Sequence, residues 1–216
     1  MIILKGITKT FSSQNILKNI NLHIKKSQKV VIYGQNGAGK SSLMRIILGE
    51  FRPNNGEVKV CSADPFLSRK DALKNISFVP QTPPPLKFSL KELCEFVCKT
   101  SDVKFDRIKF FCDKLELDLN GNLNKPFYKL SGGMKQKMLV AIAFSKDSDV
   151  LIFDEPTANL DPKARGNFIG LLDEFAKSKT LVCISHRVDE VKQICDRYIE
   201  MDLGEIIKDE TTGDHE

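Results

Sequence analysis

Apolar residues occur in two kinds of run along the chain, and the two kinds predict different parts of one α/β fold. Near-continuous apolar runs lie at residues 29–34 (KVVIYG), 149–156 (DVLIFDEP) and 180–186 (TLVCISH). Such runs are typical of parallel strands that are buried on both faces. Helical patterns separate them, as in a mostly parallel sheet covered by helices. We therefore predict that these three runs are neighbouring strands of a central sheet.

The N-terminal part of the chain has a different pattern. Residues 1–11 (MIILKGITKTF), 19–25 (NINLHIK) and 56–62 (GEVKVCS) are short strand-like runs, and turn residues lie at 12–15 (SSQN) and 54–56 (NNG). Gly, Asn and Ser favour turns because they tolerate the required backbone angles or bond to their own backbone. This pattern predicts a small antiparallel lobe that precedes or flanks the parallel core.

Strand signals vanish between residues 87 and 145, which we interpret as a helical insert. Ser89 followed by Glu92 forms a capping box in front of residues 90–99 (LKELCEFVCK), and residues 105–117 carry a helical apolar stripe. Three prolines after Gln81 form a semi-rigid entry, and residues 121–129 form the exit loop. We thus predict one domain over residues 1–216, with a core at 1–86 and 146–216 and a helical subdomain at 87–145.

Composition places the chain among ordinary globular proteins. Of its 216 residues, 41% are hydrophobic and 28% charged, which suits one generous domain or two small lobes. The net charge of +5 is spread over lysine-rich helix faces, so it indicates solvated surface rather than a nucleic-acid patch. No apolar run approaches the roughly 18 residues that span a bilayer, and the N-terminus lacks a signal-peptide pattern. We expect the chain to stay in the cytosol.

Six cysteines, Cys61, Cys94, Cys98, Cys112, Cys183 and Cys195, lack the spacing of a zinc ribbon. Cys94 and Cys98 are four residues apart on a predicted helix and could share a ligand. Without histidine partners nearby, a structural role is favoured. Reduced, buried thiols fit a reducing compartment.

Residues 34–41 (GQNGAGKS) fit a phosphate-binding loop in the required context, between a buried strand and the helical residues 41–49. Gly34 and Gly39 allow backbone N–H groups to turn inward around phosphate oxygens, and the following helix N-terminus adds favourable partial charge. Lys40 would neutralise the β- and γ-phosphates, and Ser41 would ligate Mg²⁺.

Hydrolysis requires further groups, and the ends of the other predicted core strands supply them. Asp154 can reach the Mg²⁺ shell, while Glu155 can hold the attacking water and act as general base. His186 ends the next core strand and could hydrogen-bond the γ-phosphate. The amide of Gln81 can reach Mg²⁺ or the water.

A second candidate phosphate site lies at residues 129–137 (KLSGGMKQK), where a Gly-Gly turn runs into an apolar-periodic segment. Taken together, these motifs resemble the ATP-binding cassette ATPases over roughly residues 2 to 208. The resemblance rests on Walker A (GQNGAGKS), the Q-loop Gln81, the signature LSGGM at 130–134, Walker B (LIFDE), the D-loop NLD at 159–161 and the switch histidine His186. LSGG is the most specific of them. Met134 stands where glutamine is commonest in the family.

The resemblance implies an ATPase with ATP and Mg²⁺ as cofactors. Phe11 would stack on adenine, with a core role as the alternative. Metal contacts are implied for Ser41, Gln81 and Asp154, and catalytic roles for Glu155, His186 and Gln81. The implied nucleotide contacts are Phe11, Gly34, Asn36, Gly37, Ala38, Gly39, Lys40, Ser41, Ser42, Ser131, Gly132 and Gly133.

Two subunits of this family pack head to tail, so the signature helix of one closes on the nucleotide held by the other. The resemblance therefore implies a second cassette, expected to be identical, and separate transmembrane permease subunits that dock near the helical insert. We expect the motor subunit of a transporter, peripheral on the inner face of the cell membrane. The brief insert and short C-terminus favour an export-type system. The alternatives are soluble cassette ATPases in translation, DNA maintenance, assembly or cell division.

Overall fold

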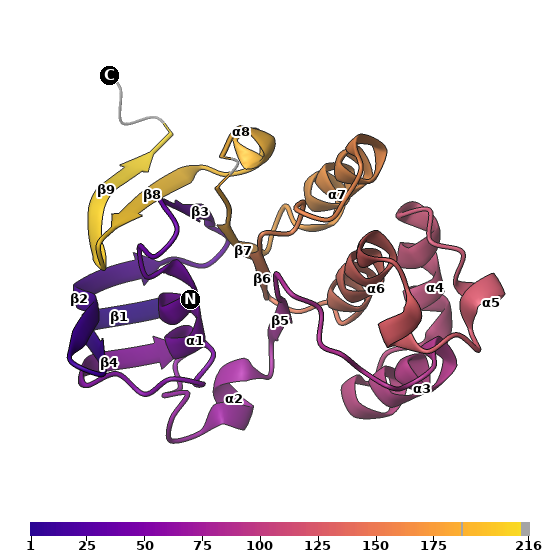
Figure 1. Cartoon of the computed structure of the whole chain (residues 1–216), viewed down its shortest axis with the longest axis horizontal. Coiled ribbons are helices and arrows are strands. Elements are labelled where there is room, and N and C mark those ends of the chain that lie inside the picture. Colours follow the sequence, from indigo (N-terminus) through magenta and orange to yellow (C-terminus); the bar gives the residue numbers. More distant parts are fainter. Residues whose placement is uncertain (187, 213–216) are drawn as a thin grey trace. The chain divides into compact units, whose positions relative to one another are not determined.

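The computed structural model describes residues 1–186 and 188–212 (Figure 1). Two compact units make up this part of the chain. The first contains Met1–Ile76, Asp149–Asp154 and the residues from Ser178 onward, and the second contains Ser77–Ser148 and Glu155–Lys177. Two sheets and the surrounding helices build the described part of the chain.

The antiparallel sheet belongs to the first unit and confirms the predicted lobe. Its strands are β1 (Ile2–Phe11), β2 (Gln14–Ile24) and β4 (Asn55–Val60), in the order β2-β1-β4. Ser12 and Ser13 have positive φ angles of 44° and 70°, which make the tight connection between β1 and β2. Ile2, Leu4 and Ile7 lie on the buried side of β1, so this sheet has one apolar face.

The larger sheet has the order β5-β6-β7-β3-β8-β9. Neighbouring strands among β6, β7, β3 and β8 are parallel, and β8 and β9 form an antiparallel hairpin. The three apolar runs are therefore strands of one sheet as predicted, with β7 between β3 and β6. Their central residues are fully buried, which explains why the sequence shows no polar alternation. The bounds are β3 (Lys29–Tyr33), β5 (Ile76–Val79), β6 (Val150–Asp154), β7 (Thr180–Ile184), β8 (Arg197–Asp202) and β9 (Glu205–Thr211).

The register of this sheet places three chain segments at one edge. Ile32 of β3 pairs with Ile184 of β7, and Ile184 pairs with Asp154 of β6. Because parallel strands share a direction, the residues that follow these three positions leave the sheet on the same side. Ligands of open α/β sheets bind at such carboxyl ends. Three helices complete the first unit: α1 (Lys40–Ile47), α2 (Arg69–Leu73) and α8 (Val188–Val191).

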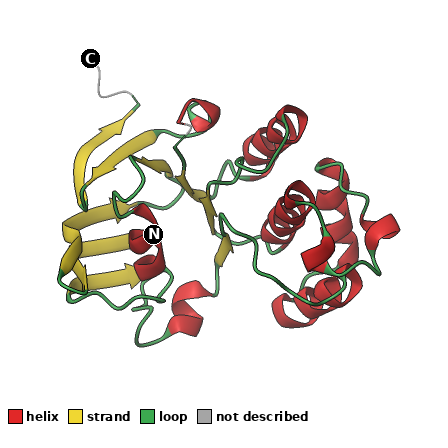
Figure 2. Ribbon diagram, in the orientation of Figure 1, coloured by secondary structure: helices red, strands yellow, loops and turns green. Residues whose placement is uncertain are grey.

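The second unit is mainly helical (Figure 2). Its helices are α3 (Leu90–Ser101), α4 (Phe105–Lys114), α5 (Leu119–Asn122), α6 (Gly132–Ser145), α7 (Pro162–Phe175) and a 3₁₀ turn at Phe127–Lys129. The predicted capping box is confirmed, since Ser89 and Glu92 exchange side-chain and backbone hydrogen bonds. The predicted exit loop at 121–129 contains the end of α5 and the 3₁₀ turn. Asp118 caps α5 by accepting a hydrogen bond from the N–H of Gly121.

Aromatic packing connects α7 to the other helices of this unit. The ring of Phe111 on α4 lies 5.6 Å from that of Phe144 on α6 and 5.1 Å from that of Phe175 on α7. These centroid distances are within the range of favourable aromatic pairs. Within the described residues, no helix is both long and apolar enough to cross a membrane.

All six cysteines are free thiols. Burial raises the pKa of Cys94 and of Cys112 to about 12, so both stay protonated at neutral pH. Cys183 is also buried, and a hydrogen bond with Cys195 raises its pKa well above the ordinary value. Cys61 and Cys98 are half-buried. Most of the cysteines thus act as small core residues.

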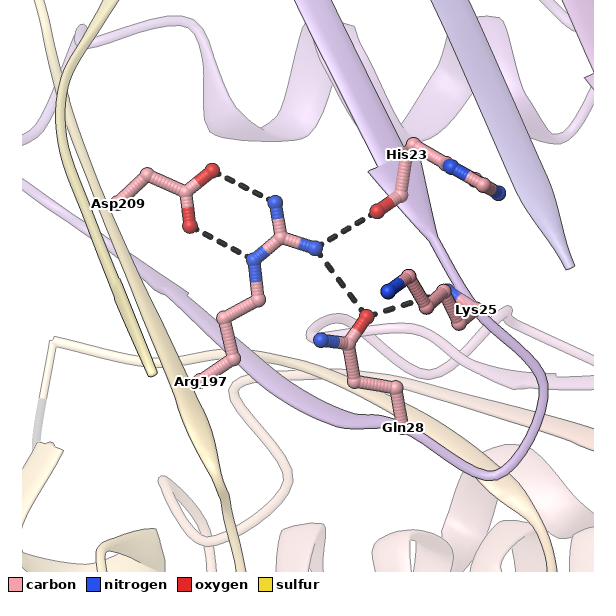
Figure 3. A network of polar contacts seen from close by, with 5 residues as sticks. All are labelled: His23, Lys25, Gln28, Arg197 and Asp209. Carbon is pink, nitrogen blue, oxygen red and sulfur yellow. Dashed lines mark hydrogen bonds and ion pairs between the residues drawn. The ribbon is translucent and has the colours of Figure 1, made fainter. Parts of the chain in front are cut away.

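Arg197 on β8 joins the two sheets of the first unit (Figure 3). Its guanidinium makes a bidentate contact with Asp209 on β9, at 2.7 and 2.6 Å. Its third nitrogen donates to the carbonyl oxygen of His23 on β2 and to the side chain of Gln28. The arginine side chain is 14% exposed, and the hydrogen bond to Asp209 raises its pKa further. A charged pair that is shielded and fully bonded holds the β8–β9 hairpin against β2.

We predict that Arg197→Met lowers the free energy of unfolding by about 2–3 kcal/mol, because Asp209 and the His23 carbonyl lose a shielded donor. Urea denaturation of the purified chain measures this. The matched control is Glu210→Gln, which breaks the exposed Lys208–Glu210 pair and should cost less than about 0.5 kcal/mol. Equal losses for the two variants would contradict the joining role of Arg197.

Candidate nucleotide-binding site

The predicted phosphate loop connects β3 to α1, which begins at Lys40. Three of its glycines have positive φ angles: Gly34 at 144°, Gly37 at 88° and Gly39 at 98°. Lys40 is only 8% exposed, and its ammonium donates to the carbonyl oxygens of Gly34 at 2.7 Å and Gln35 at 2.8 Å. The loop therefore curls around the lysine that is expected to meet phosphate.

The turn between β8 and β9 contacts the phosphate loop through backbone hydrogen bonds. The N–H of Gly204 donates to the carbonyl of Ala38 at 3.2 Å, and the carbonyl of Gly204 accepts from the N–H of Lys18 at 2.8 Å. A methyl group added at Gly34 would lie 2.0 Å from the carbonyl oxygen of Met201. The sequence did not predict the approach of Met201 to Gly34 or the hydrogen bonds of Gly204. The local signal is the pair Leu203-Gly204 between two strand-like runs, which predicts a turn but not the residues that the turn contacts.

Asp154 and His186 lie at the same edge of the sheet as the phosphate loop. Asp154 ends β6 and is half-buried, while His186 is exposed two residues beyond the end of β7. The N–H of Ser185 donates to the carbonyl of Ile32 at 3.2 Å, which continues the β7 to β3 pairing up to the histidine. The register thus gathers the loop, the carboxylate and the imidazole at the carboxyl ends of three strands of the first unit.

Glu155 is nearly buried, at 7% exposure, and has a φ of 49°. Left-handed backbone is uncommon for residues other than glycine, and such strain persists mainly at functional sites. The carbonyl of Glu155 accepts from the N–H of Ala158 at 3.2 Å, so a tight turn follows β6. The different directions predicted for the carboxylates of Asp154 and Glu155 stay a prediction.

The signature segment forms the start of α6 in the second unit. Ser131 is the N-cap, and its hydroxyl accepts from the N–H of Met134 at 3.2 Å. Ser131 and Gly132 are exposed and Gly133 is half-buried. The hydroxyl of Ser131 keeps its own proton to donate, and the first N–H groups of a helix have no partner within the helix. An anion can bind at such an end.

The predicted D-loop, residues 159–161, lies beside the start of α6. A methyl group added at Gly133 would lie 3.1 Å from the carbonyl oxygen of Asn159, and one at Gly132 would lie 3.9 Å from the Asn159 side chain. Asp161 caps α7 by accepting from the N–H of Ala164 at 2.9 Å, which lowers the pKa of its carboxyl group. The small residues of the signature therefore admit the loop closely.

Phe11 ends β1 and is 40% exposed. The rings of Phe11 and Phe51 pack edge to face with centroids 5.1 Å apart, and the ammonium of Lys9 lies 4.7 Å from the Phe11 centroid. The ring is thus held by neighbours but not buried, which suits a stacking platform better than a core side chain. Gln81 is exposed, just after the end of β5 in the second unit.

A glycine-lined loop between a buried strand and a helix, with a carboxylate ending a second strand of the same parallel sheet, defines a phosphate-loop nucleotide-binding protein. A family model described as "ABC transporter" matches residues 17–158 of the chain. The chain belongs to the ABC transporter family, and it is an ATPase cassette of that family that binds ATP.

The chain is 29% identical to the ABC transporter ced-7 of Caenorhabditis elegans over 95% of its own length and 12% of that protein. It is 33% identical to the methionine import ATP-binding protein MetN of Carboxydothermus hydrogenoformans, over 99% of its length and 67% of MetN. The chain thus spans about a tenth of the first of these relatives and two thirds of the second.

Two solved structures of the bacterial ABC transporter cassette MJ0796 are also similar. One, described as dimeric, has a TM-score of 0.85 and 28% identity, covering 98% of this chain and 99% of that one. The other, described as a dimeric post-hydrolysis state bound to ADP and Pi, has the same TM-score and coverage at 27% identity.

We predict that Gly34→Ala destabilises the chain far more than Gly37→Ala. Both positions have positive φ, so each alanine costs about 1–2 kcal/mol of backbone strain. Of these two positions, Gly34 has a backbone carbonyl oxygen 2.0 Å from the added carbon, whereas no atom of the described residues lies within 4 Å of it at Gly37. Urea denaturation without nucleotide should separate the two variants. Equal stability losses would show that the β8 backbone does not constrain the loop.

Proposed function

We propose that the chain is the ATP-hydrolysing motor subunit of an ABC transporter, which dimerises on ATP and drives a separate membrane permease. The observation that supports this proposal is that two helix starts have the features of an anion site: the glycine loop before α1 and the Ser131-capped start of α6. A chain that binds ATP alone needs only the first of these helix starts. Both are needed if each ATP is held between two chains.

The first site holds the nucleotide. Phe11 stacks on the adenine, and the loop residues from Gly34 to Ser42, including Asn36, Gly37, Ala38 and Gly39, surround the phosphates. The ammonium of Lys40 binds phosphate oxygens. A buried ammonium interacts more strongly with an anion than with a neutral carbonyl.

The donors near this loop fit Mg²⁺, which prefers oxygen ligands. Ser41 supplies a hydroxyl from the first turn of α1, and Asp154 supplies a carboxylate at the same edge of the sheet. The amide oxygen of Gln81 is a further candidate ligand by its chemistry. When bound, the ion would screen the charge of the phosphates.

Hydrolysis is assigned to Glu155, with His186 and Gln81 in supporting roles. Glu155 is the general base that accepts the proton of the attacking water. Because Glu155 is nearly buried, bulk water solvates its carboxylate only weakly. His186 donates a hydrogen bond to the γ-phosphate, and Gln81 orients the water.

The second site belongs to the partner's nucleotide. Ser131 and the N–H groups of Gly132 and Gly133 bind the γ-phosphate held by the loop of the other chain, so ATP joins two cassettes head to tail. The dimeric state of the similar cassette supports this arrangement. Hydrolysis removes the charge that holds the two chains together.

The family description, ABC transporter, supports the proposal that ATP hydrolysis is coupled to transport. We propose permease subunits that contact the second unit near Gln81, and a location on the inner face of the cell membrane through these partners. The export direction expected from the sequence stays a prediction, since MetN is named an import protein.

We predict that Glu155→Gln lowers ATP turnover by a factor of about 10²–10⁴ while ATP still binds, because the amide keeps the shape but accepts no proton. The trapped nucleotide should hold two chains together. Light scattering with ATP and Mg²⁺ should then give a mass near twice the 24.3 kDa of one chain.

The control is the double variant Glu155→Gln with Lys40→Ala, which should remain monomeric because it lacks the lysine that binds phosphate. A Glu155→Gln chain that hydrolyses ATP at the wild-type rate would exclude Glu155 as the base. A monomer at saturating ATP would count against the shared nucleotide.

A further inference from the structure

Gln136 on α6 is a buried polar residue without a hydrogen-bond partner. Its side chain is 0% exposed, and neither the nitrogen nor the oxygen of its amide has a partner among the described residues. Leaving both groups of a buried amide unpaired is costly. Orphaned side-chain groups of this kind are rare in native proteins and call for a specific explanation.

The surroundings of Gln136 on its own helix are apolar. Val140 and Ala143, about one and two turns further along, are both buried. An apolar side chain of similar size would therefore fit this face and would remove the cost of the unpaired amide. The observed conformation therefore does not explain why a glutamine occupies this position.

The helix geometry shows which part of the chain the amide faces. With 3.6 residues per turn, Gln136 lies on the face between Gly132 and Gly133, one turn further on. Helical side chains lean toward the helix N-terminus, so the amide leans toward these two glycines. The residue that packs on the same glycines is Asn159, with its carbonyl beside Gly133 and its side chain beside Gly132.

Asn159 can satisfy what Gln136 lacks. It carries a carbonyl acceptor on its backbone and both a donor and an acceptor on its exposed side chain. The loop around it is anchored on its far side, since Asp161 caps α7 and the carbonyl of Leu160 accepts from Arg165 at 3.0 Å. A small movement of residues 157–159 toward α6 would bring the two amides together.

We propose that Gln136 is a positioning residue whose amide hydrogen-bonds the Asn159 segment when nucleotide is bound. The inference rests on the proposed function, in which γ-phosphate binds at the start of α6. Asn159 lies four residues after Glu155, so nucleotide acts near both ends of the Gln136–Asn159 contact. The contact then links the signature helix of a chain to the segment that follows its own catalytic glutamate.

The first test compares melting temperatures of wild type and Gln136→Met, with and without a non-hydrolysable ATP analogue and Mg²⁺. Without nucleotide, the variant should melt about 2–8 °C higher than wild type, because methionine leaves no unpaired amide. With saturating analogue, this gap should close or reverse, because wild type then gains the hydrogen bond. Met138→Leu, at a fully buried apolar position on the same helix, should show no such dependence of its gap on nucleotide.

The second test is a double-mutant cycle on ATP turnover. Gln136→Met and Asn159→Ala should each lower kcat by about five- to tenfold with KM for ATP changed less than twofold, since neither residue holds the nucleotide. The double variant should lose no more than either single variant. Asn159 is exposed, so its variant will fold even if the core substitution is poorly tolerated.

A Gln136→Met chain that melts below wild type without nucleotide would overturn the proposal, because the amide would then already be satisfied. A gap that is unchanged by the analogue, or losses of kcat that add in full, would also overturn it. If wild type itself shows no rise in melting temperature with the analogue, the proposed function fails as well. If wild type responds and only the gap stays constant, the Gln136 inference fails alone.

Discussion

The buried lysine ammonium of the phosphate loop sets the requirements for the rest of the nucleotide site. Lys40 donates to the carbonyls of Gly34 and Gln35 within its own loop. Carbonyl dipoles compensate a buried cation less well than an anion does. The loop is thus folded around a buried charge, for which we propose phosphate as the partner, and the surrounding structure holds the loop in that shape.

Two features of the first unit provide this support. Gly34, Gly37 and Gly39 adopt backbone angles that let the loop curl, and the Gly204 turn holds the loop at Ala38. Arg197 ties the β8–β9 hairpin to β2, so that turn is fixed in place. The parallel register then brings Asp154 and His186 to the same edge of the sheet. Under the proposed function, the fold itself holds these groups in place, so less of the binding free energy is used to order them.

Much of this arrangement could be predicted from sequence because local signals encode it. Doubly buried strands appear as continuous apolar runs, and the spacing of the phosphate loop follows from what a phosphate requires. The capping box of Ser89 and Glu92 is equally local. These signals depend only on residues within a few positions of one another, so they survive without any knowledge of the fold.

Features that depend on distant contacts were not predictable. Nothing near Gly34 indicates that the Met201 carbonyl approaches it, and the φ of 49° at Glu155 is imposed by the turn it must make. The packing of α7 on α4 through Phe175 and Phe111 is likewise invisible in either helix alone. Gln136 looks like an ordinary polar residue in the sequence, and only its burial reveals the unpaired amide.

Whether one ATP is shared by two chains can be measured with mixed dimers. A Lys40→Ala chain has a defective phosphate loop and an intact signature, whereas a Ser131→Arg chain has the reverse, because a bulky cation at Ser131 blocks closure on the facing nucleotide. Each variant alone should be nearly inactive. In a mixed dimer, the intact signature of the first chain meets the intact loop of the second, so mixing should restore ATPase activity.

A fused dimer in which one subunit carries Lys40→Ala and the other is unaltered provides the control, since it shows whether one intact site can turn over alone. Recovery of activity on mixing is the result expected for a shared nucleotide. No recovery in confirmed mixed dimers, while the fused dimer is active, would show that the signature serves its own chain and would contradict the shared site.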